Sequence, residues 1–225
     1  MILTVVSWCF LGLGVATALA IAMDVRSRPQ HMWIMNVTWP ITGLYFPVVG
    51  WWLYARMGRP DSTPRHHTGS HGHHHASKPK WQSVFVGATH CGGGCVLGDC
   101  IAAPIMTMLG ITVLGSALLS HFIGEFIGAY LFGIAFQFLP LLEMGETSPT
   151  RAFIDAIKAD TLSLVAFEIG MFGWIALSFL VLLPAIPSVT TPEHWFMMQI
   201  AMIFGFATSY PANWWLIRRG IKHGM

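Results

Sequence analysis

Residues 90–100 read HCGGGCVLGDC and lie between two apolar runs, residues 84–88 and 101–109. The stretch places a histidine, three cysteines and an aspartate inside a segment that is otherwise hydrophobic or glycine. An apolar segment of about 20 residues is long enough to cross a bilayer as a helix. Because polar side chains are costly in that setting, these side chains indicate a functional site within a membrane-spanning helix.

The whole chain has the composition of a membrane protein. Of its 225 residues, 54% are hydrophobic and only 10% are charged, whereas an average soluble domain has about 25% charged residues. The mean hydropathy is +0.60. We therefore predict an all-α, polytopic transmembrane helix bundle that is surrounded by the lipid bilayer and has no nucleic-acid partner. The apolar run at residues 1–23 lacks a basic start and a cleavage site, so we expect a retained span rather than a signal peptide.

Apolar runs of spanning length predict about six spans. They cover approximately residues 2–23, 32–54, 81–102, 112–139, 161–183 and 191–217. The chain then divides into an N-terminal two-helix hairpin (1–55), a His-rich flexible loop (56–80) and a four-helix membrane core (81–225). Residues 103–111 carry no charge and fit either a turn or a re-entrant segment.

The distribution of basic residues predicts the orientation. If the N-terminus is inside, Arg26 and Arg28 are the only two of the twelve Lys and Arg residues that fall outside. Basic residues accumulate on the cytoplasmic side of membrane proteins. We therefore expect a multi-pass protein of the inner (plasma) membrane with both termini in the cytoplasm.

The hydrophilic segment after the second span is rich in histidine. Its Gly, Ser and Pro content predicts that it is disordered and has no fold of its own. Neutral imidazole is a common metal ligand, so an accessory metal-binding loop in the cytoplasm is one interpretation, and a solvated linker is the other. The histidines concerned are His66, His67, His71, His73, His74 and His75.

Several predicted spans carry ionisable residues at a similar depth. Positions four apart share one face of a helix, so Cys91, Cys95 and Asp99 form a line. Thiol, imidazole and carboxylate ligands together favour a transition metal such as Zn or Cu. The candidate ligands are His90, Cys91, Cys95, Asp99, His121, Glu125 and Glu168. The sequence therefore favours a protein that binds or transports a transition-metal cation at mid-membrane.

Two other functions fit the same residues. Cys91 and Cys95 could act as a membrane thiol redox pair if the helix opened at the triple glycine. Alternatively, the glycine-rich faces could simply pack helices, within one chain or in a homo-oligomer, in a subunit with no catalytic role. A haem ligand pair, a nucleotide-binding fingerprint and a hydrolase triad are not visible, so a classical enzyme has little support.

Two further motifs accompany the cysteine stretch. Glu168 and Met171 stand three apart, and the segments FMMQI (196–200) and YPANWWLI (210–217) lie near the end of the chain. Together with HCGGGC at 90–95, these motifs resemble a family of small bacterial and archaeal membrane proteins, the family with domain of unknown function 4396. The resemblance covers about residues 81–225. It implies a multi-pass membrane protein and no particular substrate.

Overall fold

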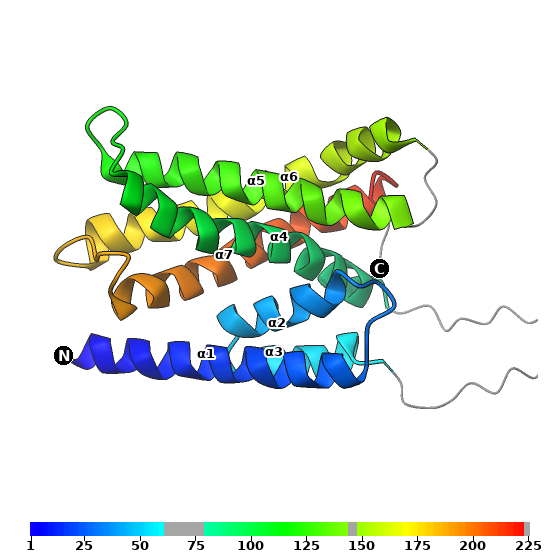
Figure 1. Ribbon diagram of the computed structural model, residues 1–225, viewed down its shortest axis with the longest axis horizontal. Coiled ribbons are helices and arrows are strands. Elements are labelled where there is room, and N and C mark those ends of the chain that lie inside the picture. Colours follow the sequence, from blue (N-terminus) through cyan, green and yellow to red (C-terminus); the bar gives the residue numbers. More distant parts are fainter. Residues whose placement is uncertain (61–78, 144–147, 223–225) are drawn as a thin grey trace, which may run out of the picture.

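The computed structural model describes residues 1–60, 79–143 and 148–222, and this part of the chain is a helix bundle (Figure 1). It contains no strand, only an isolated bridge between Val113 and Ser116. The predicted all-α class is therefore confirmed. The elements are α1 (Ile2–Ser27), α2 (Met35–Tyr45), α3 (Val49–Leu53), η1 (Tyr54–Gly58), α4 (Lys80–Leu109), α5 (Ala117–Glu143), α6 (Pro149–Leu177), η2 (Ser178–Leu182) and α7 (Pro192–Arg218).

Four helical segments are long and apolar enough to cross a membrane: Ile2–Ser27, Lys80–Leu109, Ala117–Pro140 and Pro149–Leu182. Their outward faces carry large apolar side chains such as Trp8, Leu131 and Leu180, all more than 60% exposed. Soluble monomers rarely expose extended apolar surfaces. The bundle therefore has the surface of a membrane protein.

The second hydrophobic segment turns back on itself instead of crossing the bundle. Its first leg, α2, ends at Tyr45, and its second leg comprises α3 and η1. At the tip between them, the Val48 amide donates a hydrogen bond to Thr17 Oγ1 (2.9 Å), and Thr17 lies in the middle of α1. Beyond the second leg, Arg59 pairs with Asp24 near the end of α1 (2.7 Å). Both legs therefore meet the same end of α1.

The segment over residues 32–54, which we expected to form one span, is therefore not a single helix, and Pro47 provides the reason. Proline disfavours helical backbone angles in the residue before it, and Phe46 has φ −113° and ψ 72°. The helix must end there, and its last carbonyls need other donors. Gln199 of α7 supplies one, because its Nε2 donates to the Leu44 carbonyl (2.5 Å). We call residues 35–58 the re-entrant hairpin.

α4 is the central helix and packs against α2, α5, α6 and α7. It runs without interruption through Pro104 to Leu109, so residues 103–109 form neither a turn nor a re-entrant segment. Its glycines allow the close approach of α5. A Cβ on Gly98 would overlap the backbone of Gly128 and Ala129. The expected role of the glycines in packing two helices closely is therefore confirmed within the chain.

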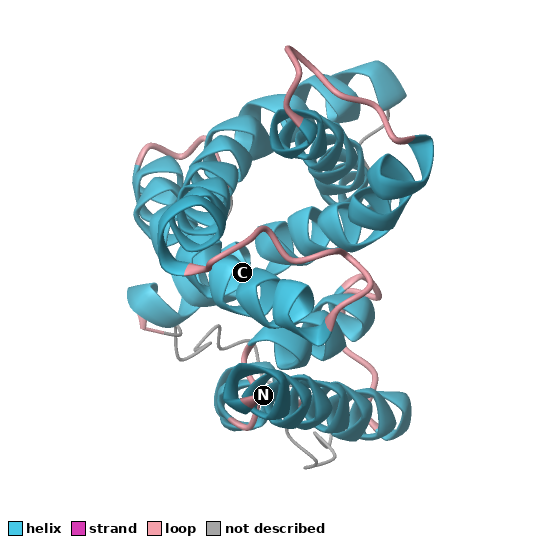
Figure 2. Ribbon diagram, turned by 90° about the vertical axis from the view of Figure 1, so that its left-hand side faces the viewer, coloured by secondary structure: helices cyan, strands magenta, loops and turns pink. Residues whose placement is uncertain are grey.

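Basic residues gather at one end of the bundle, opposite Met1. In Figure 1 this is the right-hand end, where α1 and α7 finish and where α4 and α6 begin. α1 lies at the edge of the bundle in both views (Figures 1 and 2). Because the hairpin returns to the side it came from, the start of α1 and the finish of α7 lie at opposite ends of the bundle. The expectation that both termini are cytoplasmic is not confirmed by this arrangement. The basic residues within the described ranges are Arg26, Arg28, Arg56, Arg59, Lys80, Arg151, Lys158, Arg218, Arg219 and Lys222.

Candidate functional site

A chain of polar contacts connects α4, α6 and the segment after α7 at the basic end of the bundle. Lys222 Nζ donates to Asp160 Oδ1 (3.1 Å). Ser163 Oγ contacts the same carboxylate oxygen (3.3 Å) and lies 3.2 Å from Cys91 Sγ. All four side chains are buried, and no more than 2% of any of the four residues is exposed. Buried charges are tolerated when they are paired, as this carboxylate and ammonium are.

The middle of the bundle holds two buried acids without such a pair. Asp99 of α4 and Glu168 of α6 are 0% and 2% exposed. Their four carboxylate oxygens have no hydrogen-bond partner within the described ranges. Asp99 lies within electrostatic reach of Glu168 and Glu125, and Cys95 lies within reach of Glu168. An unpaired buried carboxylate is costly, so this group of acids requires a proton or a bound cation.

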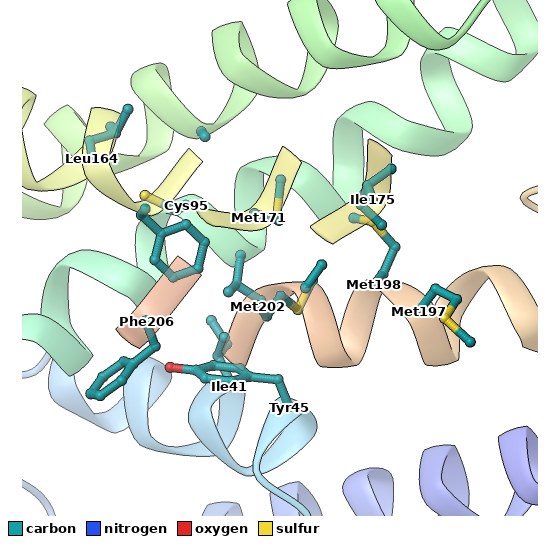
Figure 3. Packing of buried hydrophobic residues seen from close by; sticks show 14 of the residues in the cluster. Ile41, Tyr45, Cys95, Leu164, Met171, Ile175, Met197, Met198, Met202 and Phe206 are labelled. Atoms are coloured by element: carbon teal, nitrogen blue, oxygen red, sulfur yellow. The ribbon is translucent and has the colours of Figure 1, made fainter. Parts of the chain in front are cut away.

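The thiol of Cys95 also borders a sulfur-rich part of the core. Figure 3 shows Cys95, Met171, Met202 and Met198 in one cluster between α4, α6 and α7. Methionine is a common filler of irregular core space, and here it packs against Phe167 and Phe206 in the same cluster. The methionines therefore serve the packing of the core, next to the acids.

A cavity of about 150 Å³ lies at the opposite end from the basic residues. His121 and Glu125 of α5 line it, and His121 Nδ1 is 3.4 Å from Glu125 Oε1. His121 Nε2 is 3.4 Å from the hydroxyl of Thr107. His194 of α7 lines the same cavity, and neither of its ring nitrogens has a partner in the described part of the chain. The cavity thus offers two imidazoles and a carboxylate from two helices.

The positions of these groups along the helices spread them from the basic end of the bundle to the opposite end. In that order they are Lys222, Asp160, Ser163, Cys91, Cys95, Asp99, Glu168, Glu125, His121 and His194. We call these residues the polar line. Among the described residues, no three His, Cys, Asp or Glu side chains are placed to hold a single metal ion.

The remaining predicted ligands fall outside this line. His90 is buried beside its basic end, within electrostatic reach of Lys222 and Asp160, and neither of its ring nitrogens has a partner within residues 1–60, 79–143 and 148–222. Cys100, which is not one of the candidate ligands, is only partly buried. The loop histidines His66, His67, His71, His73, His74 and His75 lie outside the described residues.

Four members of the line were missed by the reasoning from sequence. Asp160 lies just before the predicted span over residues 161–183, although its spacing of eight from Glu168 places both on one helical face. Ser163 and His194 resemble ordinary polar residues of a helix. Lys222 gives no sequence signal, because its position depends on the turn at Gly220, which has a φ of +69°.

A comparison with protein families gives one match. The family model described as "Domain of unknown function (DUF4396)" matches residues 80–222. The matched region begins with α4 and ends at Lys222, so it contains the entire polar line and excludes α1 and the re-entrant hairpin. Neither the curated proteins nor the solved structures contain a match.

Proposed function

Because the chain belongs to the DUF4396 family, whose description states no activity, we propose a function from the polar line itself. The protein passes a soft or borderline transition-metal cation, Zn(II) or Cu(I), through the interface of α4, α5 and α6. The observation that carries this proposal is the pair Asp99 and Glu168, whose four oxygens find no partner among the described residues. A cation at this point would neutralise them.

The spacing of the ligands favours passage over storage. A static metal site surrounds the ion with about four ligands, whereas a conducting path needs successive sites that bind weakly enough for the ion to leave. Cys91, Cys95, Asp99 and Glu168 offer such successive steps. Thiol donors exclude a preference for Mg or Ca and favour soft or borderline ions.

A thiol redox function has less support. Cys91 and Cys95 lie on successive turns of a helix that continues through Gly92, Gly93 and Gly94, and both thiols are free. Side chains four residues apart on a helix are too divergent for a disulfide unless the helix unwinds.

Metal uptake by reconstituted protein tests the proposal. Proteoliposomes containing the Cys91→Ser/Cys95→Ser variant are expected to take up Zn(II) or Cu(I) at least about tenfold more slowly, because each lost thiolate weakens a soft-metal site. The matched control is Cys9→Ser/Cys100→Ser, which removes the two cysteines outside the line. Deleting residues 66–75 separates the contribution of the loop. Equal uptake by the two double variants, or a Cys91–Cys95 disulfide with no uptake at all, would reject the proposal.

The polar line also needs an orientation. Basic residues mark the cytoplasmic side, and those of the described ranges lie at one end. We therefore place the protein in the plasma membrane, with the basic end of the bundle on the cytoplasmic side. α1, α4, α5, α6 and α7 then cross the bilayer, and the cavity with His121 and His194 opens toward the outside.

This orientation predicts that the two ends of the chain lie on opposite sides. An epitope tag before Met1 is expected to react with antibody outside intact cells, because the re-entrant hairpin does not cross. A reporter fused after Lys222 is expected to read cytoplasmic. Detection of both tags on the same side of the membrane would mean that residues 35–58 cross it.

A further inference from the structure

The ammonium group of Lys222 lies in an unusual position for a lysine that follows the last helix. Lysine side chains are almost never fully buried unless they are paired, and this side chain is 1% exposed. The chain reaches the position by turning after α7 at Gly220, whose φ of +69° suits glycine. The Ile221 amide then bonds back to the Leu216 carbonyl (3.1 Å). The tether between the helix and the buried ammonium is therefore short.

The groups around the ammonium are those that bind a cation. Asp160 offers its Oδ1 to Lys222 Nζ at 3.1 Å, and its other oxygen, Oδ2, has no partner in the described part of the chain. Ser163 Oγ and Cys91 Sγ follow directly, 3.2 Å apart. A carboxylate, a hydroxyl and a thiol therefore lie in sequence behind one ammonium group.

We infer that Asp160, Ser163 and Cys91 form a cation-binding site at the basic end of the bundle, which the chain's own Lys222 fills in this structure. A soft divalent cation competes with the ammonium for the site. When the cation binds, Cys91 loses its proton to water and the ion contacts the thiolate and the carboxylate. The inference rests on the proposed function, because it assumes that the protein passes a cation. Cation binding at this site can nevertheless be tested without a transport measurement.

The test reads the reactivity of the Cys91 thiol. The starting protein carries Cys9→Ser, Cys95→Ser and Cys100→Ser, so that Cys91 is its one cysteine, and it is placed in lipid nanodiscs. A small, charged methanethiosulfonate reagent modifies the thiol, with and without CdCl2. The Lys222→Gln variant removes the charge at similar size, and Lys222→Arg keeps it. A chain ending at Arg219 serves as a second variant if Lys222→Gln does not fold.

The variants have different expected rates. Lys222→Gln is expected to react at least tenfold faster than its parent, because the ion pair with Asp160 that closes this end of the site is then lost, and Lys222→Arg is expected to stay near the parent rate. CdCl2 is expected to slow the reaction of Lys222→Gln, whereas MgCl2 is expected to have no effect, because Mg(II) is a hard cation.

If Lys222→Gln reacts faster but CdCl2 does not protect it, Lys222 only fills space. If Lys222→Gln reacts at the parent rate, Lys222 does not shield Cys91. Either result overturns the inference. Cadmium protection without any uptake by proteoliposomes would reject the proposed transport alone.

Discussion

Replacing Asp99 with Asn and Glu168 with Gln in one protein is expected to lower metal uptake at least about tenfold without lowering stability. An ionised carboxylate at the centre of a membrane helix costs about 3 kcal/mol, and neither acid has a partner in residues 1–60, 79–143 and 148–222. The two acids therefore hold a proton or a cation, and neutral amides of the same shape break none of their contacts. They also remove the charge that would attract a cation at the middle of the polar line.

The measurement combines uptake by proteoliposomes with thermal unfolding of the purified protein. Glu193→Gln serves as the matched control, because Glu193 lies in the first turn of α7, outside the polar line. An uptake rate equal to that of the control would show that the buried acids do not carry the ion. A large fall in the unfolding temperature of the Asp99→Asn/Glu168→Gln variant would show that they stabilise the fold.

Asp160→Asn is expected to destabilise the protein by about 3–5 kcal/mol, because it leaves a buried ammonium without its counter-charge. Adding Lys222→Met removes that charge and is expected to restore most of the loss. The matched control is Asp24→Asn, which breaks the more exposed pair with Arg59, where the two side chains are 13% and 34% exposed. Exposed pairs contribute about 0–1 kcal/mol.

Unfolding in a denaturing detergent measures these differences in stability. The four proteins compared are the unmodified protein, Asp160→Asn, Asp160→Asn/Lys222→Met and Asp24→Asn. A loss from Asp160→Asn no larger than that from Asp24→Asn would mean that water reaches Lys222. A double variant as unstable as Asp160→Asn alone would mean that Asp160 acts through contacts other than the ion pair.

Helical periodicity was enough to predict the part of the site that lies on single helices. The four-residue spacing of Cys91, Cys95 and Asp99 predicts one face of α4, and all three residues are buried in the uninterrupted helix. Those relations depend on helix geometry alone, and they need no knowledge of how the helices pack.

The re-entrant hairpin could not be predicted from hydropathy. A long apolar segment has the same composition whether it crosses a membrane or folds in half. A proline such as Pro47 can either kink a helix or end it, and the difference depends here on partners far away in sequence, Thr17 and Gln199. The buried position of Lys222 could not be predicted for the same reason, because its partner Asp160 lies on another helix, far away in sequence.

The re-entrant hairpin also has a consequence for the order in which the protein is assembled. α2 has 11 residues, about 16 Å at about 1.5 Å per residue, which is roughly half the thickness of the hydrocarbon core. Alone in lipid, its open carbonyl at Leu44 would lack a donor, and the donor it finds, Gln199, is synthesised about 150 residues later. The first part of the chain to leave the ribosome is thus among the last to reach its final place.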